Sequence, residues 1–382
     1  MPDSAPHLAP RRILIRGVNW LGDAVMTTPA LLRLRERFPA AHISLLSRDT
    51  MAELWGGHPA VNETIPFSRG EGVLDVANRL RAGNFDLALV LPNSPRSALE
   101  VWAAQIPSRI GYARRWRNWL LTRAVASRPD AVRMRKRSPA EIRHIVDGPW
   151  RETEAPILKS AHQTHEYLHL VAALGASPEP LAPQLRVPES VVDSVRRKFQ
   201  LDPAVTWLGL TPGAEYGPAK RWPVERFAAA ATEIQRRTGC GWLILGAAAD
   251  APLAGEVEAS LRTIPRVGGG ETMKEKFPVR NLAGRTSLGE LMAALKICRV
   301  LLTNDTGPMH VAAALGTPVV ALFGSTSPEL TGPGLPEDLR HRVIRSDAQC
   351  APCFLRDCPI DFRCMTGIAA ERVVNVVMDV LQ

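Results

Sequence analysis

The fold follows from one stretch near the amino terminus, Ile13-Leu14-Ile15-Arg16-Gly17-Val18-Asn19-Trp20-Leu21-Gly22-Asp23-Ala24-Val25-Met26. Its first five residues predict a short buried strand that breaks into a glycine turn. Over residues 27–38 the apolar side chains recur at helical spacing. A strand, a glycine loop and a helix follow one another in that order, which is how a parallel α/β fold begins.

The same alternation of strands and helices continues through both halves of the chain. Further strands are predicted at 42–46, 85–91, 206–210, 241–245, 300–303 and 318–323, and helices at 72–82, 222–237 and 311–315. Such alternation is typical of a parallel sheet covered on both faces. Between residues 175 and 188 stand Pro178, Pro180, Pro183 and Pro188, which neither a helix nor a central strand tolerates. We therefore expect two Rossmann-like α/β domains, residues 1–180 and 189–382.

The composition excludes several classes of protein. The chain has 382 residues, of which 46% are hydrophobic and 22% charged, so it can bury the core of two domains. Its apolar runs are far shorter than the roughly 20 residues that span a bilayer. Residues 1–12 show no export signal, and we expect a cytoplasmic protein.

Positive charge is concentrated in one segment. Lys and Arg number 47 against 38 Asp and Glu, which gives a net charge of +9. The dense part consists of Arg109, Arg114, Arg115, Arg117, Arg123, Arg128, Arg133, Arg135, Lys136 and Arg137. This basic segment either faces solvent or contacts an anionic acceptor or membrane surface.

The first candidate site is the glycine loop after the first strand, because open α/β sheets bind ligands at the carboxyl ends of their strands. Gly17 and Gly22 are five residues apart, which does not match the dinucleotide pattern G-x-G-x-x-G. Asp23 stands where this loop leads into the predicted helix. It is either an ordinary helix cap or a catalytic base in a cleft.

The second and third candidate sites follow strands of the second half. Residues 211–223, Thr-Pro-Gly-Ala-Glu-Tyr-Gly-Pro-Ala-Lys-Arg-Trp-Pro, end in Lys220 and Arg221, which suit phosphate oxygens or are simply exposed cations. Residues 303–310, Thr-Asn-Asp-Thr-Gly-Pro-Met-His, precede a helix, so the amides of Thr306 and Gly307 form a diphosphate cradle. The alternative is a plain helix cap. Small donors at 324–327 extend the same edge.

Taken together, these motifs resemble glycosyltransferase family 9. The resemblance rests on Gly22-Asp23, on Pro212 to Glu215 with Gly217 to Pro223, and on Asn304 to Gly307 with His310. Leu91-Pro92-Asn93-Ser94 with Arg96, and Arg109-Ile110-Gly111-Tyr112, are similar to the acceptor side of that family. The match extends from about residue 13 to residue 381.

The resemblance implies a GT-B fold with a cleft between two domains and an inverting transfer of heptose from ADP-heptose to the heptose of the lipopolysaccharide inner core. It implies that Asp23 is the general base and that the donor contacts are Lys220, Asp305, Thr306, Gly307, His310 and Gly213. It implies acceptor-side positions at Gly22, Asn93, Arg96 and Arg109. No metal is needed for this chemistry, because cations and amides stabilise the leaving ADP.

The partners that follow are the ADP-heptose donor, a lipid-linked core acceptor and, peripherally, the cytoplasmic face of the inner membrane, with no nucleic acid. Members of the family often carry a ribose-binding carboxylate where this chain has Gly246-Ala247-Ala248-Ala249. Glu215 or Asp250 are the available substitutes.

Four of the six cysteines gather at Cys350, Cys353, Cys358 and Cys364. Their spacing fits a structural zinc site, reduced thiols in a compact loop, or a disulfide or iron–sulfur arrangement. The histidines at 162, 165 and 169 lie on a segment whose apolar pattern predicts an ordinary packed helix.

Three other functions compete with this prediction. A related family member would add a different heptose or act on another surface glycan. A nucleotide-dependent dehydrogenase is disfavoured by the missing G-x-G-x-x-G pattern. A module that binds an anionic glycan or membrane surface without catalysis would use the basic segment, but it would leave residues 305–310 unexplained.

Overall fold

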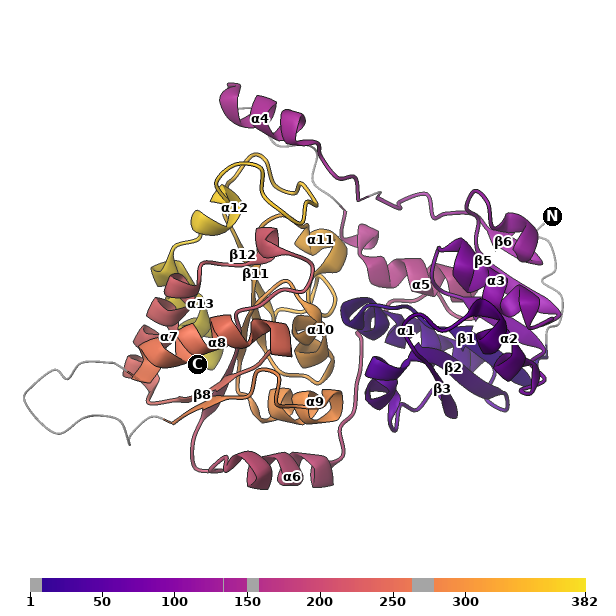
Figure 1. The fold of residues 1–382 in the computed structure, drawn as a ribbon, viewed down its shortest axis with the longest axis horizontal. Helices are drawn as coiled ribbons and strands as arrows, with labels where there is room; N and C mark the ends of the chain where they lie inside the picture. Colours follow the sequence, from indigo (N-terminus) through magenta and orange to yellow (C-terminus); the bar gives the residue numbers. More distant parts are fainter. Residues whose placement is uncertain (1–8, 133, 150–157, 263–277) are drawn as a thin grey trace, which may run out of the picture. The chain divides into compact units, whose positions relative to one another are not determined.

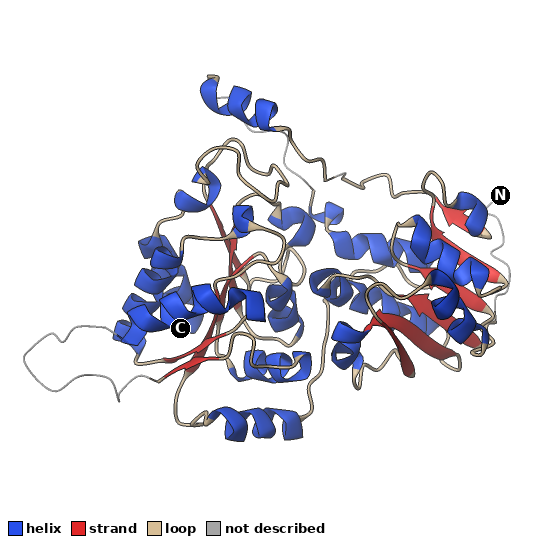
Figure 2. Cartoon of the chain, viewed as in Figure 1, coloured by secondary structure: helices blue, strands red, loops and turns tan. Residues whose placement is uncertain are grey.

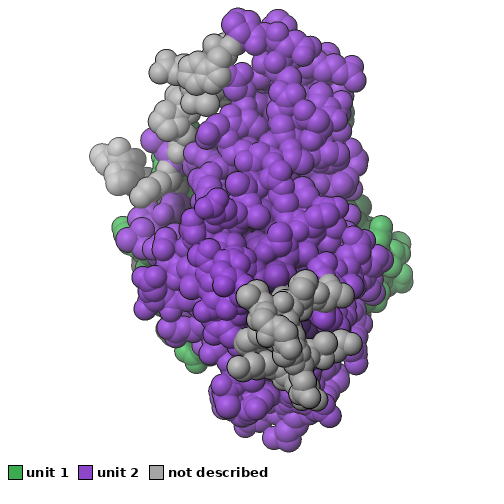
Figure 3. All heavy atoms as spheres, turned by 90° about the vertical axis from the view of Figure 1, so that its left-hand side faces the viewer, with its two compact units in different colours: residues 1–131, 160–186 green, residues 132–159, 187–382 purple. Residues whose placement is uncertain are grey.

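The computed structural model describes residues 9–132, 134–149, 158–262 and 278–382. The chain forms two compact units, which are coloured separately in Figure 3. Unit 1 contains residues 1–131 and 160–186, and unit 2 contains residues 132–159 and 187–382. Of the basic segment, Arg133 lies outside the described residues.

Unit 1 is built on a parallel sheet of six strands (Figure 1). The strands are β1 (Arg12–Arg16), β2 (His42–Arg48), β3 (Glu63–Phe67), β4 (Leu87–Val90), β5 (Ser108–Tyr112) and β6 (Arg123–Val125). The α-helices are α1 (Leu21–Arg37), α2 (Val73–Arg81), α3 (Pro95–Ala103) and α5 (Gln163–Ala172), with short 3₁₀ turns η1 (Asp49–Trp55) and η2 (Asn118–Leu120). Leu14 and Ala88 face a core filled by α2 and α3, and α1 packs against α5.

Unit 2 repeats this plan, with helices around a second parallel sheet of six strands (Figure 2). The strands are β7 (Trp207–Thr211), β8 (Gly241–Ile244), β9 (Val279–Asn281), β10 (Leu301–Asn304), β11 (Val319–Phe323) and β12 (Arg342–Arg345). The helices are α4 (Pro139–Asp147), α6 (Glu189–Phe199), α7 (Val224–Thr238), α8 (Ala251–Arg262), α9 (Leu288–Ile297), α10 (Gly307–Ala314), α11 (Pro328–Thr331), α12 (Arg363–Thr366) and α13 (Ala370–Leu381). Two 3₁₀ turns are η4 (Pro218–Lys220) and η5 (Ala248–Asp250).

Both sheets have the same strand order. Unit 1 reads β3-β2-β1-β4-β5-β6, and unit 2 reads β9-β8-β7-β10-β11-β12 from the corresponding edge. In each sheet the order reverses beside the first strand, between β1 and β4 and between β7 and β10. The carboxyl ends of the strands at such a switch point are where doubly wound folds bind ligands. The topology therefore marks one candidate binding edge in each unit.

The predicted strands and helices are present, with shifted ends. Helix α1 begins at Leu21, six residues before the predicted start at residue 27, and α10 begins at Gly307 rather than at residue 311. No strand was predicted for β3, β5, β6, β9 or β12, because none of these segments contains a continuous apolar run.

The division into units differs from the expected ranges in one segment. The boundary at 186/187 falls inside the predicted proline linker, but residues 132–159 belong to unit 2. The reason is packing, since Ile142 of α4 shares a small apolar cluster with Cys350 and Cys353. The backbone amide of Arg137 also donates to the Cys353 carbonyl at 3.0 Å. In the described part of the chain no helix is both long and apolar enough to cross a membrane.

Candidate functional site

The loop between β1 and α1 lies at the switch point of unit 1. The Gly17 amide donates to the Leu46 carbonyl at 2.9 Å, and a Cβ at Gly17 would lie 2.9 Å from that same oxygen. A larger residue would therefore push the loop off the sheet. Trp20, not Asp23, is the N-cap of α1, and Asp23 is the third residue of the helix. The capping alternative for Asp23 is wrong, because the helix starts three residues earlier than a cap at Asp23 requires.

Asp23 is partly buried and faces helix α5. Gln163 Nε2 donates to its Oδ1 at 3.5 Å and to the Tyr167 hydroxyl at 3.0 Å. Burial, followed by the negative charge of Asp23, raises the pKa of Tyr167 well above its ordinary value, so that phenol stays neutral. A carboxylate in the first turn of a helix is favoured by the helix dipole. Asp23 thus has the charge and the exposure that a proton acceptor needs.

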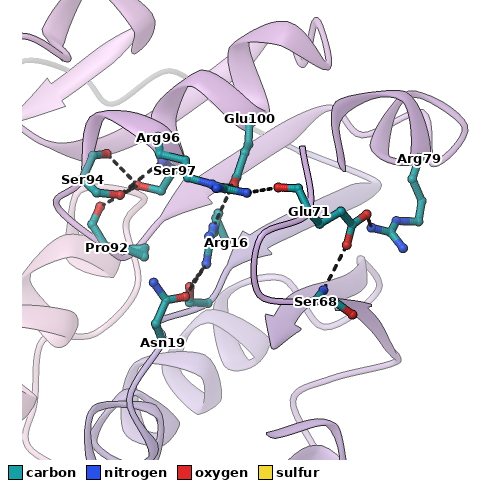
Figure 4. A network of polar contacts seen from close by, with 11 residues as sticks. Arg16, Asn19, Ser68, Glu71, Arg79, Pro92, Ser94, Arg96, Ser97 and Glu100 are labelled. Carbon is teal, nitrogen blue, oxygen red and sulfur yellow. Dashed lines mark hydrogen bonds and ion pairs between the residues drawn. The ribbon is translucent and has the colours of Figure 1, made fainter. Parts of the chain in front are cut away.

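A buried charge network supports the loops at this switch point (Figure 4). Arg16, at the end of β1, pairs with Glu100 of α3, with 2.8 Å between Nε and Oε2. Both side chains are almost completely buried. Arg96 pairs with the other oxygen of Glu100 at 2.9 Å and donates to the backbone carbonyl of Glu71. One carboxylate therefore pairs with two guanidinium groups near the candidate site.

The network also orders the ligand-facing loops. Arg16 Nη1 donates to the Gly17 carbonyl at 2.6 Å and to Asn19 Oδ1 at 3.1 Å. Ser94 caps α3 by accepting from the Ser97 amide at 3.2 Å. Asn93, just before this cap, is exposed at the carboxyl end of β4, next to the β1 loop in the sheet order. One edge of the unit 1 sheet therefore carries Gly22, Asp23 and Asn93. Arg96 is linked to this edge by its ion pair with Glu100, which also pairs with Arg16 at the end of β1.

Arg109 does not join this group. It lies toward the amino end of β5, and its guanidinium donates to the carbonyls of Leu120 at 2.8 Å and Ile106 at 2.5 Å. The structure therefore places this predicted acceptor-side residue away from the carboxyl ends of the strands, where parallel sheets bind ligands.

In unit 2, Asn304 ties together the two loops at the switch point. Its Nδ2 donates to the carbonyls of Pro212 at 2.8 Å and Gly213 at 3.3 Å, and its Oδ1 accepts from the Trp222 amide at 3.0 Å. Asn304 is completely buried. One side chain at the end of β10 therefore sets the path of the loop that follows β7.

Lys220 and Asp305 meet across these two loops. Lys220 Nζ lies 2.6 Å from Asp305 Oδ2, and the Thr326 hydroxyl donates to the same oxygen at 2.5 Å. The ammonium also lies 4.9 Å from the centre of the Tyr216 ring. Because Asp305 is 4% exposed, this ion pair is shielded from bulk water. Arg221, the other predicted phosphate ligand, instead donates to the Ala214 carbonyl at 3.3 Å.

Helix α10 starts directly after Asp305. Thr306 is its N-cap residue, but no hydrogen bond from its side chain caps the helix. In the first turn Pro308 has no N–H, and the Met309 amide donates to the Thr306 carbonyl at 3.1 Å. The amides of Thr306 and Gly307 stand at the amino end of the helix, where anions commonly bind. His310 is buried on the next turn. The structure brings Lys220, Asp305, Thr306, Gly307 and His310 to one edge.

Asp250 lies against Gly213 at this edge. A Cβ at Gly213 would stand 2.0 Å from Asp250 Oδ1, so the close approach requires glycine unless the carboxylate moves. Asp250 Oδ2 accepts from the Ala247 amide at 3.0 Å. Of the two acidic candidates for the ribose, Asp250 is the one that adjoins a predicted donor-binding residue, while Glu215 is exposed.

The cysteine-rich segment 350–364 packs against the loops that follow β7 and β11. The Ala219 amide donates to the Arg356 carbonyl at 2.9 Å, and the amides of Cys353 and Phe354 donate to the Ser325 carbonyl at 3.1 and 2.7 Å. A Cβ at Gly217 would lie 2.6 Å from the Arg356 oxygen. The segment thus braces the turn that carries Lys220.

The thiols of this segment are free and mostly buried. Burial, together with neighbouring thiols, raises the pKa of Cys350 and Cys353, and it raises that of Cys364 to about 12. The three thiols are therefore protonated at neutral pH, which agrees with the reduced-thiol alternative. Within the described ranges, no group of three or more His, Cys, Asp or Glu side chains is placed to hold a metal ion.

Three residues near the sites were not identified from the sequence. Arg16 and Glu100 are 84 residues apart, and Gln163 is 140 residues from Asp23, so no local pattern connects them. The one signal in the sequence was Arg16, a charged residue in an otherwise apolar strand. A charge buried in a strand needs a partner of opposite charge, and this indicates that one exists elsewhere in the chain.

Comparison with known proteins identifies the family of this chain. The family described as "Glycosyltransferase family 9 (heptosyltransferase)" matches residues 73–362. Lipopolysaccharide heptosyltransferase 2 of Escherichia coli K12 is 33% identical over 344 residues, covering 87% of this chain and 88% of that protein. The protein of the same name from Salmonella typhimurium LT2 gives the same values.

Solved structures give the same result. The structure of Escherichia coli ADP-heptose lps heptosyltransferase II has a TM-score of 0.74 and 30% identity, and it covers 97% of this chain and 98% of that one. The Escherichia coli heptosyltransferase WaaC with ADP has a TM-score of 0.68 at 16% identity and covers 97% and 99%, a likeness of fold. The chain therefore belongs to glycosyltransferase family 9 and is a glycosyltransferase with the two Rossmann-like units of the GT-B fold.

Proposed function

We propose that this chain moves heptose from ADP-L-glycero-D-manno-heptose to the heptose of the lipopolysaccharide inner core, with inversion at the anomeric carbon. One observation carries the proposal: the switch point of unit 2 joins Lys220 and Asp305 at the start of α10, while that of unit 1 presents a carboxylate. The names of the relatives support the choice of donor and acceptor.

Unit 2 holds the donor in this proposal. The diphosphate lies at the amino end of α10, where the amides of Thr306 and Gly307, the ammonium of Lys220 and the ring of His310 contact its oxygens. Asp305 Oδ2 orients Lys220, and its Oδ1 accepts from hydroxyls of the sugar. Asp250 binds the ribose beside Gly213. These groups stabilise the charge that develops on ADP as it leaves.

Unit 1 holds the acceptor and supplies the base. The acceptor hydroxyl oxygen bonds to the anomeric carbon as the bond from that carbon to the ADP oxygen breaks. The hydroxyl proton moves to the Asp23 carboxylate, and ADP leaves with the bonding electron pair. Gln163 holds Asp23 in position, and Gly22 and Asn93 border the acceptor. General-base assistance of this kind typically contributes about 10² to 10⁴-fold in rate.

The acceptor is lipid-linked, so the enzyme works at the cytoplasmic face of the inner membrane, in peripheral contact with it through the basic segment. Catalysis needs no divalent metal in this scheme, and ADP release should be unchanged by a chelator. A zinc ion bound by Cys350, Cys353, Cys358 and Cys364 remains a separate prediction with a structural role, and metal analysis of the purified chain tests it.

The decisive experiment follows ADP release from ADP-heptose with three acceptors: a core that carries heptose, a core that lacks it, and none. We expect turnover with the heptose-bearing core alone. Turnover with only the heptose-free core would identify a different heptosyltransferase. Absence of ADP release with both cores, with a properly folded protein, would refute the proposed reaction.

A further inference from the structure

Four tryptophans are exposed in the described part of unit 1. One of them, Trp20, is the N-cap residue of α1. The other three, Trp102 of α3, Trp116 and Trp119, have exposed fractions of 44%, 76% and 67%. Trp102 and Trp119 pack edge to face, with ring centres 5.9 Å apart. Tryptophan is a large side chain that is highly buried on average, so a group of exposed tryptophans needs an explanation. We call these three residues the tryptophan patch.

The fold presents the tryptophans outward. Trp116 has a φ of 69°, a left-handed conformation that bulky residues rarely adopt. The next residue, Arg117, is completely buried, and its Nη1 donates to the Pro92 carbonyl at 2.5 Å. Leu120 is buried as well. Because Arg117 and Leu120 anchor the turn, Trp116 and Trp119 are held on its solvent side, and strained backbone of this kind points to function.

Positive charge accompanies the tryptophan patch in the sequence. Between Glu100 and Asp130 there are six arginines and no acidic residue. Arg117 is buried and Arg128 pairs with Glu166, whereas Arg115 and Arg123 are exposed. Glu100 itself is buried and paired with Arg16 and Arg96. The guanidinium of Arg115, an exposed residue, lies 5.8 Å from the centre of the Trp116 ring. A partner that complements this surface is apolar where it meets the rings and negatively charged around them.

We infer that the tryptophan patch docks the enzyme on an anionic lipid bilayer. Indole rings settle at the boundary between headgroups and acyl chains, and nearby arginines are attracted to an anionic membrane surface. The inference deepens the proposed function, on which it rests, because a lipid-linked acceptor is presented at such a surface. It assigns membrane contact to defined side chains of unit 1 rather than to the basic segment as a whole.

Vesicle flotation of the full chain tests the inference. The probes are vesicles of phosphatidylethanolamine with phosphatidylglycerol and, for comparison, vesicles of phosphatidylcholine. We expect binding to the anionic vesicles that weakens with salt, and about tenfold weaker binding for the double variant Trp116→Ala, Trp119→Ala. The corresponding double Phe variant should retain most of the binding. The control Leu339→Ala removes a side chain of unit 2 that is 78% exposed and should change nothing.

Turnover separates this inference from the proposed reaction. The Ala variant should match the wild type on an acceptor stripped of its acyl chains and fall behind it on an acceptor embedded in anionic vesicles. Equal flotation of wild type and Ala variant, or none for either, overturns the inference. So does a solution dimer that the Ala substitutions dissociate, because the patch would then be a protein interface. Vesicle binding without ADP release on either acceptor would instead remove the proposed reaction.

Discussion

The switch points of the two units share one strand order but use charge differently. In unit 1 the ion pair of Arg16 with Glu100 is buried beneath the loops, and the partly exposed Arg96 pairs with the same carboxylate. In unit 2 the ion pair of Lys220 with Asp305 lies at the edge itself, in the loops after β7 and β10. The same topology therefore places a charge pair beneath the loops in one unit and within the loops in the other.

This difference separates the expected consequences of substitution. Variants at the unit 1 edge should change either the rate of transfer or the stability of the fold. Asp23 is the proposed base, whereas Glu100 holds the loops through its ion pairs with Arg16 and Arg96. Variants at the unit 2 edge should change the affinity for ADP. The experiments below test that separation, and each has an outcome that would break it.

The largest effect is expected for Asp23→Asn. The amide keeps the shape of the side chain but accepts no proton, so turnover should fall by about 10² to 10⁴-fold. Titration with ADP should give the wild-type affinity, because no donor contact involves unit 1 in the proposal. If the variant turned over normally, Asp23 would not be the base, and if it lost ADP affinity, the two edges would not divide the work as described.

Glu100→Gln should lower the free energy of unfolding by about 3 kcal/mol, since removing one partner of a buried pair leaves an uncompensated charge. Two guanidinium groups depend on this carboxylate. Chemical denaturation measures the change. Glu233→Gln on α7, which breaks ion pairs on the surface, is the matched control and should be close to neutral. Equal stability of the two variants would show that the unit 1 network is not a scaffold.

Lys220→Ala should weaken ADP binding by roughly 10-fold or more, because a charge-assisted hydrogen bond to phosphate is lost. Turnover at saturating donor should fall much less than in Asp23→Asn. Calorimetric titration with ADP gives the affinity, and Lys220→Arg should recover part of it. Unchanged affinity in the Ala variant would take Lys220 out of the donor site.

In each unit a buried histidine with a lowered pKa should make the fold less stable in acid. Burial lowers the pKa of His58 to about 4 in unit 1 and that of His341 to about 4 in unit 2, where burial outweighs the attraction of Asp338. The unfolded chain, with a histidine pKa near 6.5, binds these protons first. Stability should thus decline as the pH falls through about 6.5 and level off below about 4, by on the order of 1 to 2 kcal/mol per histidine near pH 5.

Thermal unfolding as a function of pH measures this decline. His58→Asn and His341→Leu should each flatten the profile in part, and the double variant more. A profile that is as steep in the double variant as in the wild type would assign the acid sensitivity to other groups.

The smallest effect is expected for Asp250→Ala. Losing one carboxylate contact to the ribose should weaken ADP binding by about fivefold, the effect of a single hydrogen bond. Affinity for 2′,3′-dideoxy-ADP should be the same in both proteins, since that ligand lacks the hydroxyls. Equal losses for both nucleotides would mean that Asp250 only shapes the loop around Gly213.

The central strands could be predicted from the sequence because both of their faces are buried. Residues 13–15 and 318–323 are apolar runs, as expected in the middle of a parallel sheet. The edge strands β3 and β12 are half exposed and contain polar residues, so their pattern does not differ from that of a loop. The start of α1 was placed late because its first turn contains a glycine and no side-chain cap.

Much of the candidate site was predictable because its residues lie in short motifs directly after buried strands. The joining of Lys220 to Asp305 at one edge follows from the motif order and the parallel sheet. The network around Glu100 was not predictable, because it depends on contacts between residues far apart in the chain. The placement of Arg109 was missed because apolar spacing identifies a strand without showing which end approaches the ligand.

Residues 132–159 belong to unit 2, although the chain on either side of them belongs to unit 1. This arrangement decides where the protein can be divided into fragments. The polypeptide crosses from one unit to the other three times, at 131/132, 159/160 and 186/187. A recombinant fragment that ends at Arg186 would therefore contain α4 without Cys350 and Cys353, which pack against Ile142. The apolar side chains of α4 would then be exposed and would promote aggregation. A soluble amino-terminal fragment should need a short tether in place of residues 132–159, and the complementary fragment should need this stretch supplied as a separate peptide.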